Sequence, residues 1–326
     1  MIVDVKTAVV LLNLGGPDSL DAVEPFLNNL FNDPDIIDLP FGSFGRRILA
    51  KIISTRRSKK VRHYYELIGG KSPIGDMTSC QASALEKALS GKGDFKVFVA
   101  MRYWRPFTHE ALEEIRREGI KNVVLLPLYP QYSKTTTGSS LNEWERCVKR
   151  MGLSGLSVTK IPRFYDHPGY IGALVEQIEK AAEAFSSRDG IHLIFSAHGV
   201  PQKVIDRGDP YEAQIKATVQ AVVNRLGSKY PHHLAYQSRV TPEKWLGPLT
   251  EEKIVELADQ GVKRMLIVPI SFVSDHSETL YEINILLRSI AEEHGVKEFV
   301  LMPGLNDSPA FIRALADVVL KLYKAI

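Results

Sequence analysis

The chain has 326 residues, of which 44% are hydrophobic and 24% are charged, so it is long enough for one large or two medium-sized cores. Its formal net charge of +3 gives no general electrostatic attraction for nucleic acid, so we expect no nucleic-acid partner. Its two cysteines are too few for a disulfide framework or a four-thiolate cluster within one chain.

The start of the chain and its hydropathy favour a cytoplasmic protein. The opening segment MIVDVKTAVVLLNLGG has an early acidic residue, Asp4, no cationic leader and only a short apolar core, which is too little for a secretory signal. No apolar run reaches the ~18 residues that a membrane span needs. We therefore expect a cytoplasmic protein, with a surface that is able to touch lipid.

Short apolar runs alternate with amphipathic stretches along the chain, which predicts parallel sheets covered by helices on both faces. The predicted strands are residues 7–13, 94–100, 122–128, 157–163, 191–197, 232–238, 264–270 and 298–302. The predicted helices, several with Ser, Thr or Asp as N-cap (Ser277 before the seventh of them), are residues 76–90, 108–118, 140–151, 168–186, 210–226, 250–260, 278–294 and 308–324.

These elements predict the fold class α/β, with two similar Rossmann-like lobes, each a four-stranded parallel sheet flanked by helices. We place the N-terminal lobe at residues 1–165 and the C-terminal lobe at residues 166–305. We expect the last helix, within residues 306–326, to pack back on the N-terminal lobe.

An internal repeat supports the two-lobe prediction. The segment THEALEEIRREGIKNVVLLPL at 108–128 aligns without a gap on TEEKIVELADQGVKRMLIVPI at 250–270, and six of the 21 aligned positions are identical. The matching glycines Gly119 and Gly261 fall where each helix must stop, and the apolar positions keep the same phase. We interpret the two halves as a duplicated α/β lobe.

The repeat places a histidine and an acidic cluster at one sheet edge. In a sheet of order 2-1-3-4, the first and third strands are neighbours, and ligands bind at their carboxyl ends. His198 ends the first strand of the second lobe, Asp275, His276 and Glu278 follow the third, and Glu282 lies one helical turn later. An imidazole and a carboxylate that meet there suit either coordination of a divalent metal such as Fe(II) or proton transfer near neutral pH.

Two other segments have open interpretations. The motif LNLGGP at 12–17 is not GxGxxG, so nucleotide binding there is not favoured. Residues 39–65 combine apolar and aromatic side chains with seven Arg or Lys between Arg46 and Lys60. This segment is either a solvated basic helix face, or a lip that rests on an anionic bilayer or holds an apolar ligand with acidic arms.

Taken together, the motifs resemble the ferrochelatases, lyases that insert Fe(II) into a porphyrin in the last steps of haem synthesis. The motifs that carry the resemblance run through nearly the whole chain and are LLNLGGP, YELIGGKSPI, RYWRPFT, LYPQYSKTTTGSSLNEW, FSAHGVP, QSRVTPEKWLGP and SFVSDHSETLYEI. The resemblance implies the chelatase fold, with a porphyrin dicarboxylate and Fe(II) as substrates. It also implies peripheral membrane contact through the lip, about residues 39–60.

The resemblance also implies roles for single residues. His198 would meet the metal or take pyrrole protons, and Glu278 would be its acidic partner across the porphyrin face; which of the two meets the metal first stays open. Asp275 and His276 would orient that pair, and Glu282 would continue an acidic line along the helix. The residues implied to line the macrocycle pocket are Leu14, Tyr65, Arg102, Tyr103, Tyr132 and Trp245, with Arg57, Lys60 and Ser238 near the propionates.

The chain departs from the family pattern in two places. Some members hold a [2Fe-2S] cluster through one internal cysteine and three in a C-terminal extension, whereas this chain has Lys134 at the internal position and stops at Ile326. We expect no cluster and no other resident cofactor. The acidic line of well-studied members includes a third glutamate two turns beyond Glu278, where this chain has Leu286, so a full carboxylate channel is in doubt.

Several functions remain open at this point. The long basic lip favours protoporphyrin IX, but two further propionates would also find cations there, which keeps coproporphyrin III as an alternative substrate. A non-catalytic tetrapyrrole-binding module is an alternative of another class. A nucleotide-dependent transferase on two Rossmann-like lobes is a third, and the absence of a phosphate loop argues against it.

Overall fold

The structure is a computed structural model that describes residues 5–36, 42–227, 229–239 and 241–323. The chain forms two compact units: unit 1 comprises Met1–Arg163 and Leu315–Ile326, and unit 2 comprises Phe164–Ala314. The start of the predicted lip, 39–41, and the end of the last segment, 324–326, lie outside the described residues. None of the described helices combines the length and apolar character that crossing a bilayer requires.

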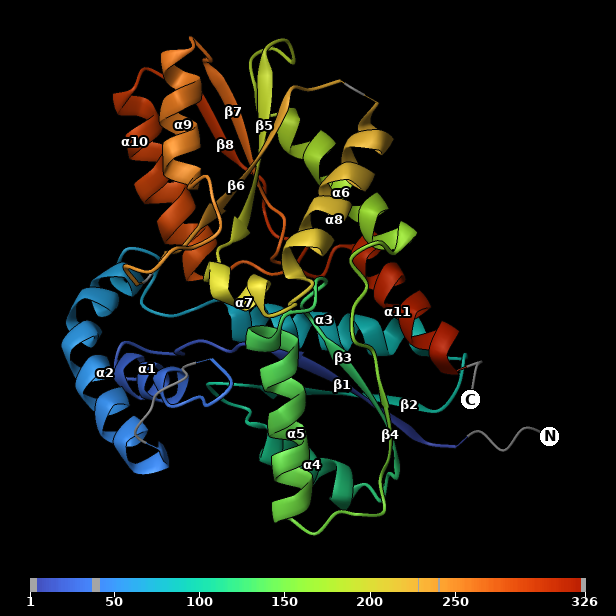
Figure 1. Cartoon of the computed structure of the whole chain (residues 1–326). Helices are drawn as coiled ribbons and strands as arrows, with labels where there is room; N and C mark the ends of the chain where they lie inside the picture. Colours follow the sequence, from blue (N-terminus) through green and yellow to red (C-terminus); the bar gives the residue numbers. More distant parts are fainter. Residues whose placement is uncertain (1–4, 37–41, 228, 240, 324–326) are drawn as a thin grey trace. The chain divides into compact units, whose positions relative to one another are not determined.

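Unit 1 is built on a parallel sheet of order β2-β1-β3-β4 (Figure 1). Its strands are β1 (Thr7–Asn13), β2 (Phe95–Met101), β3 (Asn122–Pro127) and β4 (Ser157–Lys160). Every residue of β1 is buried, which fits a central parallel strand made of a continuous apolar run. The predicted strand order is confirmed.

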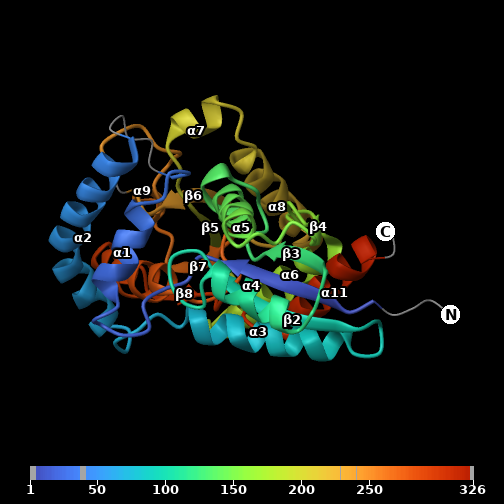
Figure 2. The ribbon, with the colours of Figure 1, turned by 90° about the horizontal axis from the view of Figure 1, so that it is seen from below.

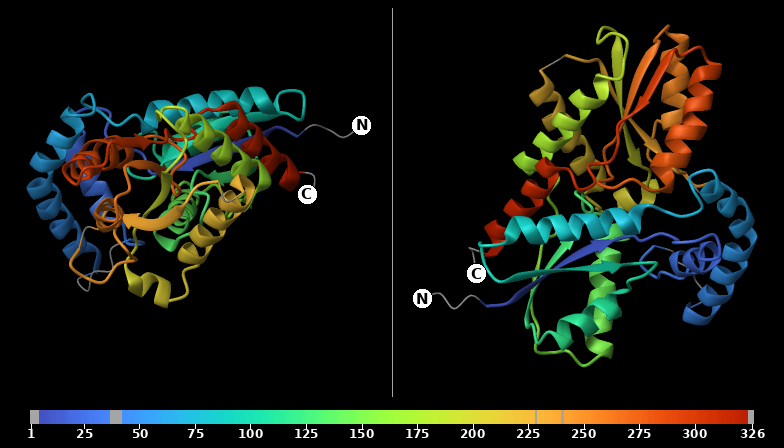
Figure 3. Two further views of the ribbon diagram at one scale, coloured as in Figure 1. Left: turned by 90° about the horizontal axis from the view of Figure 1, so that it is seen from above. Right: turned by 180° about the vertical axis from the view of Figure 1, so that it is seen from behind.

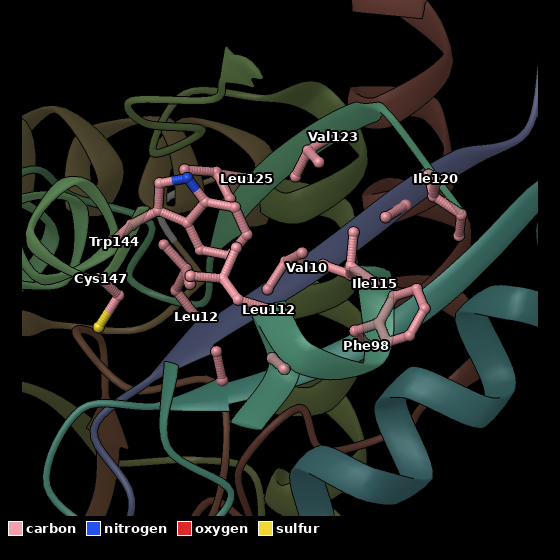
Figure 4. Packing of buried hydrophobic residues seen from close by; sticks show 13 residues of the cluster. Val10, Leu12, Phe98, Leu112, Ile115, Ile120, Val123, Leu125, Trp144 and Cys147 are labelled. Carbon is pink, nitrogen blue, oxygen red and sulfur yellow. The ribbon is translucent and has the colours of Figure 1, made fainter. Parts of the chain in front are cut away.

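Helices cover both faces of this sheet. Helices α4 (Thr108–Arg117) and α5 (Ser139–Arg150) cover one face. Figure 4 shows Trp144 and Leu112 from these helices packed among apolar side chains of the strands, in a cluster that also holds Val10 and Leu125. On the other face, α3 (Ile74–Leu89) runs along β1 and β2 (Figure 3).

Two further helices of unit 1, α1 (Val23–Phe31) and α2 (Gly42–Glu66), lie side by side (Figures 1 and 2). The sequence analysis predicted no helix at α1, and it gave a helix over residues 39–65 as one of two open interpretations. The buried positions of α2 include Ala50, Ser54 and Ser58, which are small, and the two serines are polar. They leave no hydrophobic period to read, because such a signal depends on large apolar side chains on the buried face.

Unit 2 repeats the arrangement with a parallel sheet of order β6-β5-β7-β8. Its strands are β5 (Ile191–His198), β6 (His232–Gln237), β7 (Arg264–Pro269) and β8 (Glu298–Leu301). Its helices are α6 (Pro168–Ala182), α7 (Gln202–Asp206), α8 (Tyr211–Leu226), α9 (Thr250–Asp259) and α10 (Arg288–Glu293), and α11 (Pro309–Tyr323) begins in unit 2 and ends in unit 1. Helices α9 and α10 cover one face of the sheet, and α6 and α8 cover the other (Figure 1).

The repeated segments have the same local structure in both units. Glu110 in α4 accepts a hydrogen bond from the backbone N–H three residues earlier, at 2.6 Å, and Glu252 in α9 does the same at 2.9 Å. Both helices end at a glycine in the left-handed region, Gly119 with φ 68° and Gly261 with φ 87°. The predicted helix stops are confirmed.

In both units a π-helix follows the third strand. These are η1 (Lys134–Gly138) in unit 1 and η2 (Glu278–Leu287) in unit 2. The prediction of an α-helix over 278–294 is therefore wrong for its first ten residues, and the side chain of Ser277 makes no capping hydrogen bond. Such wide turns are frequent at functional sites.

Candidate active site

The site in unit 2 is centred on His198, the last residue of β5. Strand β5 pairs with β7 up to Ser196 and Pro269, so the segment after β7 leaves the sheet beside His198. That segment leads into η2, whose first residue is Glu278. The distance from His198 Nδ1 to Glu278 Oε2 is 3.0 Å, so the predicted meeting of these two side chains is confirmed.

The expected slot between the two side chains is absent. We expected Glu278 across the porphyrin face from His198, and a direct hydrogen bond of 3.0 Å leaves no space for a macrocycle between them. Strands β5 and β7 are neighbours, and the segment after β7 brings the start of η2, with Glu278, back to the end of β5.

Two side chains fix the backbone of His198. Its N–H donates to Ser271 Oγ at 2.9 Å, and its carbonyl oxygen accepts from the Tyr211 hydroxyl at 2.9 Å. Phe272 lies next to the ring of His198, with centroids 6.2 Å apart, and next to the ring of His276, with centroids 4.3 Å apart. Sequence reasoning missed Ser271, Tyr211 and Phe272. The first and third follow shortly after the end of β7, and ligands of parallel sheets bind at the carboxyl ends of the strands.

His276 is buried and lies on the other side of Glu278. Its Nδ1 is 3.1 Å from the carbonyl oxygen of Ser274, and because a carbonyl only accepts, Nδ1 carries a hydrogen. Its Nε2 has no hydrogen-bond partner and lies 3.7 Å from Glu278 Oε2. Glu278 thus has an imidazole on each side.

Asp275 holds the loop after β8 and does not contact His198 or Glu278 with its carboxylate. It accepts hydrogen bonds from the backbone N–H of Gly304 at 3.0 Å and from Asn306 Nδ2 at 2.8 Å. A weaker bond of 3.3 Å from the Thr279 hydroxyl ties the same carboxylate to the first turn of η2. Asp275 therefore orients the π-helix η2, which carries Glu278. Its effect on His198 and Glu278 is indirect, through the position of η2.

Glu282 and Ser238 form the acidic end of the site. Ser238 donates its backbone N–H to Glu282 Oε1 at 2.8 Å and its hydroxyl to Glu282 Oε2 at 2.6 Å, and the hydroxyl lies 3.4 Å from Glu278 Oε2. Ser238 thus contacts two carboxylates in this structure, and its expected place near the propionates stays a prediction.

The charges of the site shift its pKa values in opposite directions. Partial burial would lower the pKa of His198, but the charge and hydrogen bond of Glu278, with a contribution from Glu282, raise it above its ordinary value. Burial would raise the pKa of Glu278, but the charge and hydrogen bond of His198, supported by His276, hold it well below its usual range. Burial and then the charge of Glu278 raise the pKa of Glu282, against the hydrogen bonds from Ser238.

His198 and Glu278 are the residues that the sequence suggested for metal contact. An imidazole and a carboxylate are suitable donors for Fe(II). Within residues 5–36, 42–227, 229–239 and 241–323, no three His, Cys, Asp or Glu side chains are grouped so that they could hold a metal ion.

The predicted pocket residues of unit 1 gather in one cluster but are largely covered. Leu14, Tyr65 and Tyr103 belong to the apolar cluster beneath α1 and α2, where Tyr65 is 4% and Tyr103 is 1% exposed. The Tyr103 hydroxyl donates to Asp33 at 2.6 Å, and Arg102 pairs with the same carboxylate at 2.9 Å. Tyr103 and Arg102 thus form a network with Asp33 that is largely buried, and their place in the lining of the macrocycle pocket stays a prediction.

The remaining predicted residues are more accessible. Arg57 and Lys60 are exposed on α2, over the rings of Phe31 and Tyr64 respectively. Tyr132, in the loop after β3, is half-buried. Trp245 in unit 2 is also half-buried, and its indole N–H donates to the Thr241 hydroxyl at 2.9 Å. A Cβ at Gly199 would come within 3.3 Å of the Trp245 ring, so this ring lies beside the residue that follows His198.

One face of α2 and one of η2 expose large apolar side chains. Phe44, Ile48 and Ile52 are 76%, 48% and 43% exposed, and their spacing of four residues puts them in one stripe along α2. Leu286, where a third glutamate was expected from the resemblance, is 43% exposed, and Ile285 beside it is 38% exposed.

The family model and the curated relatives that match this chain name the same family. The ferrochelatase family model matches residues 6–322. A ferrochelatase of Aquifex aeolicus is 52% identical over 314 residues, which cover 96% of this chain and 98% of that relative. One of Geotalea daltonii is 53% identical over 314 residues, covering 96% and 97%, and one of Cyanothece sp. is 47% identical over 319 residues, covering 97% and 82%.

Solved structures that are distant in sequence share the fold. The structure of SirB from Bacillus subtilis with Fe3+ matches with a TM-score of 0.60 at 11% identity, covering 96% of this chain and 94% of that one. The sirohydrochlorin chelatase SirB from Bacillus subtilis subspecies spizizenii, in complex with cobalt, matches with a TM-score of 0.53 at 9% identity, covering 98% and 96%. The predicted fold class, two four-stranded parallel sheets flanked by helices, is confirmed as that of chelatases.

Proposed function

Because the chain belongs to the ferrochelatase family, and so is a chelatase that inserts Fe(II) into a porphyrin, we propose that its porphyrin substrate is protoporphyrin IX. The observation that carries this preference is helix α2, which exposes the apolar side chains Phe44, Ile48 and Ile52 in its first half and the cations Arg57 and Lys60 in its second half. Protoporphyrin IX has an apolar, vinyl-bearing edge and two propionates. Coproporphyrin III replaces the vinyl groups by two more propionates, which an apolar stripe does not favour.

The test of this preference is a direct comparison of the two porphyrins. The rates of insertion of Fe(II) into protoporphyrin IX and coproporphyrin III are measured anaerobically, in one detergent, from the change in porphyrin absorbance. We expect kcat/KM to be at least about tenfold higher for protoporphyrin IX, which corresponds to about 1.4 kcal/mol of transition-state binding. A reversed ratio would identify a coproporphyrin ferrochelatase, and no metal insertion with either porphyrin would leave a binding module.

Insertion of Fe(II) releases two pyrrole protons, and the acidic site of unit 2 has groups for both. His198 accepts the first, because the Glu278 carboxylate at 3.0 Å makes its imidazole more basic. Glu282 accepts the second, because burial and the charge of Glu278 raise its pKa. Glu278 itself stays ionised and stabilises the imidazolium, and either member of the pair offers a donor atom to Fe(II) as its water shell is lost.

Distortion of the macrocycle belongs to the same proposal. A planar porphyrin keeps its nitrogen lone pairs in the ring plane, so the metal reaches them only when the ring bends. Contacts at the rim and the propionates supply the binding energy for a strain of about 1 to 5 kcal/mol. On this proposal the enzyme needs no resident cofactor and no [2Fe-2S] cluster, since Fe(II) is a substrate and no step above uses another group.

We also propose that α2 rests on an anionic bilayer. The stripe Phe44, Ile48 and Ile52 is flanked by exposed cations of the same helix, Arg47 and Arg56 among them. An apolar face bordered by Lys and Arg is the pattern of helices that lie in the plane of a membrane surface. A porphyrin with an apolar edge would then reach the enzyme at the membrane surface.

A further inference from the structure

Ser238 has an unusual backbone conformation for its residue type. It follows β6 directly, and its φ is 66°, in the left-handed region. Among the described residues other than glycine, Asn306 alone shares a positive φ with it. Glycine adopts this conformation freely and asparagine tolerates it, whereas serine is disfavoured. Such local strain is found where the side chain or backbone has a use.

The contacts of Ser238 show what its side chain does in this site. Its backbone N–H and its hydroxyl hold the two oxygens of Glu282 at 2.8 and 2.6 Å, and the hydroxyl is 3.4 Å from Glu278 Oε2. The left-handed backbone lets both donors point at one carboxylate. Ser238 thus fixes the side chain of Glu282 through two hydrogen bonds and keeps it beside Glu278.

A neighbouring amide fixes the direction of the hydroxyl hydrogen. Gln237 Oε1 accepts from the Ser196 hydroxyl at 2.6 Å, so its Nε2 faces Ser238 Oγ, at 3.5 Å. Because this amide nitrogen donates, Ser238 Oγ accepts from it and its own hydrogen points toward the carboxylates. A line of polar groups therefore runs from β5 through Gln237 to Glu282.

We propose that Ser238 is a positioning residue of the insertion reaction, which holds the Glu282 carboxylate next to the His198–Glu278 pair. Two carboxylates four residues apart in η2 repel each other, and without the hydroxyl the Glu282 side chain moves away into other rotamers. This inference rests on the proposed function, since it concerns the same site. It differs from a role in propionate binding, which would act on porphyrin affinity.

The test uses two variants that both suit a left-handed backbone. Ser238→Gly keeps the backbone N–H and removes the hydroxyl, whereas Ser238→Asn keeps a side-chain donor. For each variant, kcat and the KM for porphyrin and for Fe(II) are measured anaerobically, together with the melting temperature. The matched control is His232→Gln, an exposed position at the other end of β6.

We expect Ser238→Gly to melt no lower than the wild type, because glycine relieves the strained φ, and to lose at least about tenfold in kcat with porphyrin KM within twofold. Ser238→Asn is expected to recover part of kcat. A raised porphyrin KM with unchanged kcat, or equal kcat in all variants, would overturn the positioning role. Failure of the wild type to insert Fe(II) in the same assay would overturn the proposed function itself, and this inference with it.

Discussion

At the residue scale, unit 2 holds a hydrogen-bonded acid–base pair, to which we assign the chemistry of Fe(II) insertion as a proposal. His198 and Glu278 each favour the charged form of the other, so the pKa of the imidazole is raised and that of the carboxyl is lowered. The bond of 3.0 Å makes the pair one unit in which the carboxylate sets the basicity of the imidazole. Tyr211 and Ser271 hold the backbone of that imidazole in place.

The first prediction follows from this coupling. As a base, His198 must be neutral, so kcat/KM rises with pH through the raised pKa of His198. Glu278→Gln removes the carboxylate that raises this pKa, so the acid limb of the profile moves to lower pH while kcat falls by about 10². The measurement is the pH profile of Fe(II) insertion for wild type and variant. An acid limb at the same pH in both proteins would contradict the coupling.

The sequence predicted the meeting of these residues but not their contacts. The order of parallel strands places the ends of β5 and β7 side by side, which is a property of the chain's periodicity and topology. Whether His198 and Glu278 touch or leave a gap depends on side-chain rotamers and on the wide turn of η2, neither of which the sequence specifies. The same applies to Ser238, whose left-handed backbone gives no signal in the residue type.

At the scale of elements, α2 has one buried face and an exposed surface on which we propose the substrate and membrane contacts. Ala50, Ser54 and Ser58 are buried, and the opposite side exposes apolar and cationic side chains. Arg57 and Lys60 are three positions apart, so they lie on the same side of the helix. We propose that these two cations bind the two propionates of the substrate.

The second prediction concerns these cations. In the double variant Arg57→Glu and Lys60→Glu, we expect porphyrin KM to rise at least about tenfold with kcat within threefold, because attraction for the propionates becomes repulsion while the acid–base pair is untouched. Lys59→Glu is the control, since it reverses one exposed positive charge on the same helix, which is half the charge change of the double variant. Equal porphyrin KM in the wild type and the double variant would refute the propionate assignment.

The third prediction concerns the apolar stripe of α2. The wild type is expected to float with vesicles that contain anionic lipid and to bind neutral vesicles less, because both apolar burial and charge contribute. Phe44→Ser with Ile48→Ser should lose most of this binding. Val5→Ser, another exposed apolar position of unit 1, serves as the control. Flotation of the double variant at the wild-type level would exclude the stripe as the contact.

The π-helices could not be predicted from the sequence. A hydrophobic pattern read at 3.6 residues per turn locates a helix over 278–294 but does not distinguish a wider turn in its first part. For helix α2 the sequence left two interpretations open, because most of its buried residues are small and give no clear hydrophobic period. Both cases are local structures that packing and polar contacts decide.

At the scale of the whole molecule, the chain is a duplicated unit in which one copy carries the acid–base pair. Both sheets have the same strand order, and both third strands lead into a π-helix. The residue that follows β1 in unit 1 is Leu14, whereas β5 in unit 2 ends on His198. This architecture was predictable because strand order and helix stops follow from apolar runs and from Gly119 and Gly261.

The central claim is that His198 performs proton transfer or metal contact in Fe(II) insertion. The most direct measurement is anaerobic formation of metalloporphyrin by His198→Ala, with porphyrin affinity determined on the same protein. The account predicts a loss of at least about 10² in kcat with porphyrin affinity within twofold of wild type. Turnover near the wild-type rate in this variant would contradict it.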